Sequence, residues 1–204
     1  MDKSKILPAS FYNRSVTLVA KELLGKKLVR MIGDRKISGI ICETEAYDGM
    51  QDLACHARVG ITKRNEVMFG PAGCAYVYFT YGMHWCLNVV TGAVGYPAAV
   101  LIRALEPQEG LAIIAINREN VLRKNWTNGP AKLTKALQID RSQNGISLHN
   151  QENHLWIEEG WVIPDNFIKV GPRIGIDKTP EPWRSMPWRY RFDPHENSFS
   201  ETDE

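Results

Sequence analysis

Apolar residues at helical spacing mark residues 14–24, and Gly25 stands where that helix would end. Extended patterns follow in residues 27–32 and 34–49, in the aromatic and β-branched stretch 72–90, and in the apolar segment 98–107. We interpret these stretches as strands, the last one buried on both faces. Strands in such close succession favour an antiparallel sheet.

Helical patterns return in residues 108–120, with an acidic first turn after Pro107, and in residues 129–139, where Pro130 suits a first helical position. Asn144-Gly145 predicts a tight turn, and residues 154–160 and 167–176 are typical of late strands. Prolines make residues 173–192 irregular. Their arginines and aromatic residues either track a nucleic-acid backbone or pin the segment across the core, with the second interpretation favoured. The pattern as a whole predicts an α+β fold.

Length and charge refine this picture. With 204 residues, 44% of them hydrophobic, we expect one domain over residues 1–192. The tail 193–204 carries five of the 23 acidic residues, so 25 basic and 18 acidic side chains precede it, a net charge of +7. We expect the tail to be disordered. A basic domain is compatible with a polyanionic partner, although many such domains bind no nucleic acid.

No run of roughly 20 apolar residues is present, so no membrane partner is predicted and a cytoplasmic location is expected. The four cysteines, at positions 42, 55, 74 and 86, form no CxxC pair, and we interpret them as reduced structural thiols. His56 has no second ligand at a spacing typical of metal sites. The sequence therefore predicts neither a metal nor a cofactor.

The stretch ICETEAYDG, residues 41–49, carries the most informative polar residues. In a strand, Glu43, Glu45 and Tyr47 would share one face, with successive side chains about 7 Å apart. Because Ile37 and Ile41 fall on that face, the carboxylates are candidates for a tuned acid or base, with a hydrogen-bonded structural role as the alternative. A glycosidase pair is disfavoured, because two groups on one strand approach a substrate from one side.

Residues 55–73 read as a glycine-punctuated loop that carries His56, Arg58, Lys63 and Arg64. Such a loop either holds phosphates or is merely a solvated basic surface.

The aromatic residues between positions 76 and 85 are expected to pack in the core, Phe79 and Trp85 in particular. Gly82 predicts a bend that would expose Tyr81 and Met83. An exposed tip of this kind beside a basic loop is typical of a DNA-kinking wedge.

Five segments, taken in order, resemble the alkyladenine (3-methyladenine) DNA glycosylase family of mammals and many bacteria. They are ETEAYDGMQDLACHA, TKRNEVMFGPAGCAYVYFTYGMHWCLNVV, AAVLIRALEP, NGPAKLTKAL and RIGI. The resemblance runs from about residue 18 to residue 192. It implies a compact α+β domain with a curved antiparallel sheet surrounded by helices, resembling the formyltransferase C-terminal-domain-like fold.

Site residues are implied by the same resemblance. Glu45 matches the general base that activates water, and Arg103 matches the residue that helps to position that water. Tyr47, His56 and Tyr78 match the walls around a flipped base, and Asn88 matches the position that opposes the 2-amino group of guanine. Tyr81, with Met83 beside it, matches the wedge, and the backbone contacts would be Arg58, Lys63, Arg64 and Lys132.

The implied reaction is base excision from double-stranded DNA without strand cleavage, by a monomeric hydrolase that needs no cofactor. The implied lesion is an alkylated purine, 3-methyladenine first, with 7-methylguanine and hypoxanthine as further candidates. In a bacterium we would expect the protein at the nucleoid. Two rival interpretations stay open: a module that binds distorted DNA without cutting it, and a hydrolase of small nucleosides.

Overall fold

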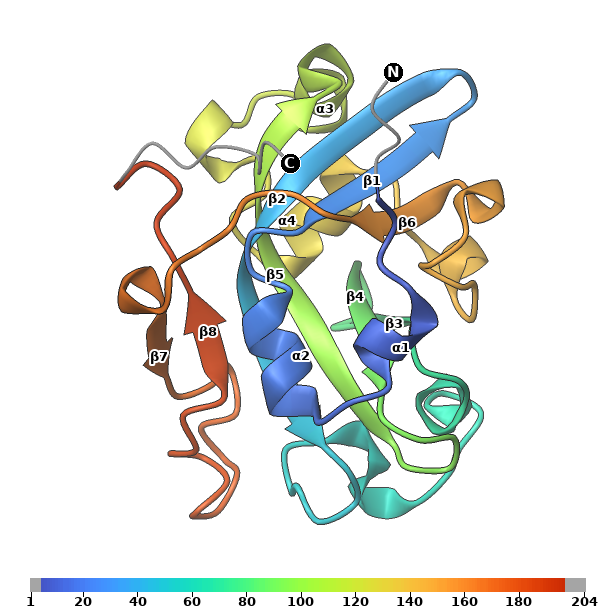
Figure 1. Ribbon diagram of the computed structural model, residues 1–204, viewed down its shortest axis with the longest axis vertical. Coiled ribbons are helices and arrows are strands. Elements are labelled where there is room, and N and C mark those ends of the chain that lie inside the picture. The colour runs from blue at the N-terminus through green and yellow to red at the C-terminus, as the bar shows by residue number, and fades with distance from the viewer. Residues whose placement is uncertain (1–4, 197–204) are drawn as a thin grey trace.

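One antiparallel sheet organises residues 5–196, the part of the chain that the computed structural model describes (Figure 1). The strand order is β3-β4-β5-β2-β1-β6; in addition, β8 pairs with β2 and β7 pairs with β8. All these pairings are antiparallel, which confirms the α+β class. The strands are β1 Lys27–Ile32, β2 Arg35–Asp48, β3 Ala75–Thr80, β4 His84–Thr91, β5 Ala98–Glu109, β6 Leu155–Glu158, β7 Lys169–Gly171 and β8 Arg189–Arg191.

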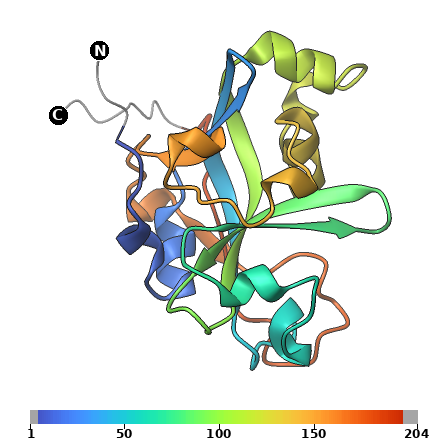
Figure 2. The same cartoon turned by 90° about the vertical axis from the view of Figure 1, so that its right-hand side faces the viewer.

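Strand β2 is the centre of the sheet, since it pairs with β1, β5 and β8. Its pairing with β5 shifts register at three places, between Ser38 and Gly39 and twice around Glu43. Such bulges increase the local twist and bend a strand. Figure 2 shows that the β3–β4 hairpin projects sideways from the direction of β2 and β5.

Short helices cover both faces of this sheet. They are α1 Ala9–Tyr12, α2 Val16–Glu22, α3 Leu111–Asn117 and α4 Pro130–Ala136, with 3-10 turns η1 His56–Val59, η2 Glu66–Phe69, η3 Arg123–Asn125, η4 Arg141–Gln143, η5 Gln151–Asn153 and η6 Asp165–Phe167. Helix α2 buries Val16, Val19 and Ala20 against β2 and β5. Helix α4 lies on β4 and β5. A smaller apolar cluster forms beneath the η1–η2 loop, around Cys55, Met68 and Tyr76.

Three predictions about elements are wrong in detail. The strand β5 continues through Glu109, so α3 begins at Leu111 with no acidic residue in its first turn, because Gly110 at φ 70° turns the chain there. Of residues 167–176, only Lys169–Gly171 form a strand. The segment expected to be irregular contains β8, while the rest of residues 173–188 is indeed without helix or strand.

Phe79 is also a correction. It is 44% exposed, because it lies near the tip of the β3–β4 hairpin, beyond the point where helices cover the sheet. Its ring packs on Trp85 at 4.7 Å between centroids, and Trp85 in turn is half-buried against the main core.

The start of the predicted tail packs against the domain. Glu196 accepts a hydrogen bond from Lys169 at 2.9 Å, and His195 lies 3.5 Å from Glu106 on β5. Residues 197–204 lie outside the described residues, so the expected disorder of the tail stays a prediction. No helix within residues 5–196 is long and apolar enough to cross a membrane.

Candidate active site

The polar row of β2 lies on the face of the strand that points away from helix α2. Thr44, between the two glutamates, points to α2 and donates its hydroxyl to the Ala20 carbonyl. Glu45 and Tyr47 share the other face, where the Tyr47 hydroxyl donates to Glu45 Oε2 at 2.9 Å. The predicted alternation is confirmed, and it brings a carboxylate and a phenol into direct contact.

Glu45 is fully buried and receives three hydrogen bonds. Besides the Tyr47 hydroxyl, Arg103 Nη1 donates to Oε2 at 3.2 Å, and the Ile174 backbone N–H donates to Oε1 at 2.7 Å. Burial raises the pKa of Glu45, while Arg103, the Ile174 N–H and the Tyr47 hydroxyl oppose that rise. A buried carboxylate with a raised pKa and directional donors is typical of a general base.

Glu43 is bound differently from Glu45. Its Oε1 accepts from Arg103 Nε at 3.0 Å and lies 3.4 Å from Arg189 Nη1 of β8. Two guanidinium groups therefore hold one partly exposed carboxylate, and Arg103 bridges both glutamates. Arg103 is therefore held between Glu43 and Glu45, and the expectation that only one of the two carboxylates is catalytic stays a prediction.

A cavity of about 260 Å³ is lined by all three residues that donate hydrogen bonds to Glu45, although Glu45 itself is not among its lining residues; we call it the base cavity. The cavity is lined by six of the residues named from the sequence: Tyr47, His56, Tyr78, Tyr81, Asn88 and Arg103. Its volume lies just below the roughly 300–1,000 Å³ of pockets for drug-sized ligands, which suits a ligand as small as one nucleobase. Six residues named from the sequence thus line one cavity, and their roles stay predictions.

His56 and two tyrosines form one wall of the base cavity. The ring of His56 meets that of Tyr78 edge-on at 4.5 Å, and its Nδ1 is 2.9 Å from the Tyr76 hydroxyl. Burial, followed by the charges of Arg64 and Arg58, lowers the pKa of His56 to about 4. His56 is therefore neutral near pH 7 and offers a flat aromatic surface without a charge.

Asn88 lies on β4 and is almost fully buried. Its amide nitrogen donates to the Tyr76 carbonyl on the paired strand at 2.9 Å. The side chain is therefore fixed in orientation at the inner wall of the base cavity.

The bend between β3 and β4 carries the two exposed residues expected there. Tyr81 adopts φ 50° and is 83% exposed, and Met83 is 66% exposed. Tyr81 lines the base cavity and also an adjoining groove of about 800 Å³, whereas Met83 lines neither. The predicted exposure of the tip is confirmed, and its role stays a prediction.

The predicted backbone cations are distributed unevenly. Arg58 and Arg64 line the adjoining groove, together with Lys178 from the C-terminal segment. The Arg64 guanidinium also lies over the Tyr78 ring at 5.3 Å and donates to the Phe79 carbonyl. Lys63 lies beside this groove without lining it, and Lys132 on α4 donates to Asn128. The adjoining groove is therefore lined by two of the four predicted backbone cations, Arg58 and Arg64.

Two parts of the site were not found from the sequence. The buried side chain of Asn65 holds the η1–η2 loop closed, because its amide donates to the carbonyls of His56 and Gly60. Ile174 supplies a backbone N–H from a position 129 residues along the chain from Glu45. In the sequence, only the resemblance of NEV (residues 65–67) and RIGI (residues 173–176) to the family indicated these segments. It identified the role of neither Asn65 nor Ile174.

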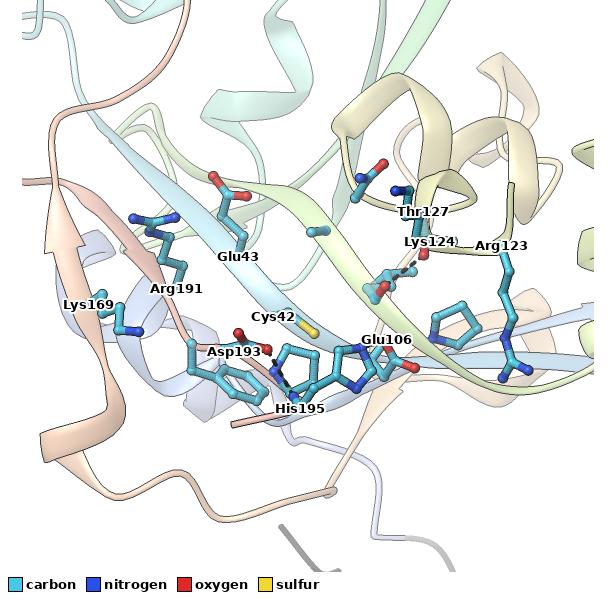
Figure 3. A pocket seen from close by; sticks show the side chains of 16 residues that line it. Cys42, Glu43, Glu106, Arg123, Lys124, Thr127, Lys169, Arg191, Asp193 and His195 are labelled. Carbon is cyan, nitrogen blue, oxygen red and sulfur yellow. Dashed lines mark hydrogen bonds and ion pairs between the residues drawn. The ribbon is translucent and has the colours of Figure 1, made fainter. Parts of the chain in front are cut away.

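A second cavity, of about 770 Å³, lies further along β2 and β5 (Figure 3); we call it the second groove. It is lined by residues that include Glu43, Glu106, Arg123, Lys124, Lys169, Arg191, Asp193 and His195. Both acidic and basic side chains line it, and Phe192 is the single large aromatic residue among the described residues that line it.

The cysteines are free, and three of the four are buried, which confirms their interpretation as structural thiols. Burial raises the pKa of each of them, as expected for thiols that do not react. Among residues 5–196, no group of three or more histidine, cysteine or acidic side chains is arranged to hold a metal ion.

An aromatic cavity of nucleobase size whose lining residues donate to a buried carboxylate, with cations in the adjoining groove, fits a hydrolase that acts on a base attached to a polyanion. Comparison with known proteins identifies the family. Residues 10–196 match the methylpurine-DNA glycosylase family, so the chain belongs to it. The protein is a DNA glycosylase, a hydrolase of N-glycosyl bonds, and a DNA-repair enzyme.

Similar proteins carry names that assign them provisionally to the 3-methyladenine DNA glycosylases. A protein of Carboxydothermus hydrogenoformans is 50% identical over 91% of this chain and 94% of its own length. A Myxococcus xanthus protein is 49% identical over 90% of this chain and 88% of its own. One from Bacillus cereus is 46% identical over 92% and 96%. The resemblance stated from the motifs is thus confirmed.

Proposed function

We propose that this protein flips an alkylated purine, 3-methyladenine in the first place, out of duplex DNA and hydrolyses its N-glycosidic bond. The names of its relatives support 3-methyladenine as the lesion. The basic groove beside the base cavity supports DNA, a polyanion, as the substrate. The observation that carries the proposal is Glu45: the three residues that donate hydrogen bonds to this buried carboxylate all line the base cavity.

Chemistry follows from that arrangement. Glu45 accepts a proton from a water molecule, the water oxygen bonds to C1′ of the deoxyribose, and the bond to the purine breaks with its electron pair leaving on the base. Positive charge develops on the sugar in the transition state, and the carboxylate stabilises it in a buried setting. Arg103 orients the carboxylate and the water through its fixed fork of donors. A cationic alkylated purine leaves as a neutral base, so no strong general acid is required.

Binding of the flipped base rests on aromatic stacking. Tyr47, His56 and Tyr78 offer aromatic surfaces, and the neutral state of His56 avoids repulsion with a positively charged lesion. Extrusion costs a few kcal/mol, least for a damaged base, and this selects against normal pairs. Asn88, fixed by its bond to Tyr76, would oppose the 2-amino group of guanine.

The exposed Tyr81 would fill the gap that the flipped base leaves, with Met83 beside it on the tip. Arg58 and Arg64, with Lys63 and Lys132 further out, would contact the phosphates. The product would be an intact strand with an abasic site, since no lysine lines the base cavity among the described residues and an imine with the sugar would need one. The domain would act as a monomer in the cytoplasm or at the nucleoid.

Two rivals predict different results. A module that only binds distorted DNA would not need a buried carboxylate that accepts three hydrogen bonds. A nucleoside hydrolase would not need the cationic groove. Removal of 7-methylguanine and hypoxanthine is a further proposal; hypoxanthine, a neutral leaving group, is the harder substrate.

The deciding experiment is an excision assay with methylated duplex DNA and a panel of duplexes that each contain one lesion. We expect free 3-methyladenine in the supernatant and strands that break only after alkali treatment. Tight binding without release of a base would favour the binding module. Equal hydrolysis of free nucleosides would favour the small-molecule enzyme, and covalent trapping of the protein on DNA by borohydride would contradict hydrolysis by water.

A further inference from the structure

A buried ion pair lies behind the wall of the base cavity that Tyr47 forms. The side chains of Arg173 and Asp52 are both fully buried. The guanidinium binds both carboxylate oxygens, at 2.5 Å to Oδ2 and 2.9 Å to Oδ1. Neither residue lines the base cavity or the adjoining groove. A buried pair is expensive to desolvate, and a hydrophobic replacement often serves stability as well.

The contacts of this pair converge on the site. Arg173 also donates to the Ala46 carbonyl, between Glu45 and Tyr47 on β2, and its guanidinium lies over the Tyr47 ring at 4.7 Å. The next residue along the chain, Ile174, donates its N–H to Glu45. Arg173 therefore fixes both a wall of the base cavity and one donor to its carboxylate.

Asp52 extends the connection to a third segment. Its carboxylate accepts from the backbone N–H groups of Asp48 and Ala54, which closes the turn that leads to η1 and His56. The segment that carries Ile174 has neither helix nor strand between residues 172 and 188, so no ladder of backbone bonds holds it in place. Its position near β2 depends on side-chain contacts, among which Arg173 also binds the Trp183 carbonyl.

We infer that Arg173 and Asp52 are positioning residues: their ion pair clamps the C-terminal segment and the η1 turn onto β2, and so holds the Ile174 N–H on the general base. This inference rests on the proposed function, in which Glu45 is that base. Neither residue touches substrate, so their effect passes through Glu45 and Tyr47.

Loss of the clamp has a specific consequence. The Ile174 N–H lowers the pKa of Glu45, so its displacement moves that pKa further upward. The base is then protonated over a wider acidic range, and excision needs a higher pH. The charged and titratable groups that face Glu45 are Arg103 of β5, Glu43 and Tyr47 of β2, and Cys86 of β4, and the substitutions below leave all of them in place.

The test compares the single-turnover release of 3-methyladenine from methylated DNA as a function of pH. For Asp52→Asn we expect about tenfold slower release on the acidic side of the profile, with recovery as the pH rises, because a displaced donor acts on the charge of Glu45. Arg173→Lys keeps the positive charge without the fork and should behave in the same way if Asp52→Asn does not fold.

The control is Glu158→Gln. Glu158 is another buried carboxylate, bound to Trp156 Nε1 on the edge strand β6. Its loss should lower stability and leave the pH profile unchanged. An Asp52→Asn variant that slows release by the same factor at every pH would overturn the inference. If the wild type releases no base, the proposed function fails; if it does and only the profile stays fixed, the clamp alone is rejected.

Discussion

The base cavity and the second groove lie along the same pair of strands, and the larger one is the poorer candidate. The second groove has about three times the volume, 770 Å³ against 260 Å³. Each is associated with a glutamate whose pKa is raised by burial: Glu45 accepts hydrogen bonds from residues that line the base cavity, and Glu106 lines the second groove. Glu45 has two side-chain donors and a backbone N–H aimed at it, whereas Glu106 faces the exposed His195 at 3.5 Å.

The difference teaches that neither volume nor a shifted pKa defines this site. Catalysis needs hydrogen-bond donors that stay fixed while charge develops, and it needs bulk water to be excluded from around the one reacting water molecule. Aromatic rings enclose the base cavity, while charged chains in contact with solvent surround the second groove (Figure 3). Equivalent substitutions in the two regions test this comparison.

The largest effect should come from the two glutamates. Glu45→Gln should lower single-turnover excision by about a thousandfold, because general acid–base catalysis contributes roughly 10²–10⁴ in rate. It should still bind lesion-containing DNA. Glu106→Gln should excise at the wild-type rate. Comparable losses in both variants would break the comparison, and undiminished cleavage by Glu45→Gln would exclude Glu45 as the base.

The second comparison is between His56 and His195, and it concerns how the free energy of unfolding depends on pH. Because the pKa of folded His56 is about 4, below its ordinary value, the unfolded chain binds this proton first as the pH falls. Stability is therefore lost between about pH 6.5 and about pH 4, by about 3 kcal/mol in total. Urea unfolding measured at intervals from pH 7 downward should show this loss in the wild type and less of it in His56→Gln.

His195 supplies the control, because its side chain is 76% exposed and solvent screens its pairing with Glu106. His195→Gln should follow the wild-type curve. An identical acid sensitivity in wild type and His56→Gln would mean that His56 is protonated as readily in the fold as in the unfolded chain.

The smallest effect should separate two exposed arginines: Arg58, in the groove that adjoins the base cavity, and Arg123, in the second groove. If Arg58 contacts a phosphate, Arg58→Ala should make the slope of log K against log[salt] shallower by about 0.9. Arg123→Ala should leave that slope unchanged in the same titration with duplex DNA. A shallower slope for Arg123→Ala would place the second groove within the DNA footprint, and the two regions would then share a partner.

Most elements could be predicted locally, because alternation and helical spacing are properties of neighbouring residues. Strands β1 to β4 and helices α2 and α4 are examples, as are the exposed Tyr81 and the shared face of Glu45 and Tyr47. The errors arise where residues far away in the sequence determine the structure. Strand β8 forms because β1 pairs with β2 only as far as Ile40, which leaves that side of β2 free for β8 at Glu43–Glu45. Phe79 is exposed because the hairpin extends beyond the covering helices.

The sequence by itself determined the class of fold and the family, and it named the candidate residues of the site, since all three depend on residue types in a fixed order. Only the tertiary structure decided that Arg103 bridges Glu43 and Glu45, that Glu45 is sealed from solvent, and that Ile174 completes its donors. Such bonds join residues about 60 to 130 positions apart, and no local pattern encodes their geometry. The stretch from residue 41 to 49 supplies the proposed base, and two other segments, which carry Arg103 and Ile174, complete its hydrogen bonds.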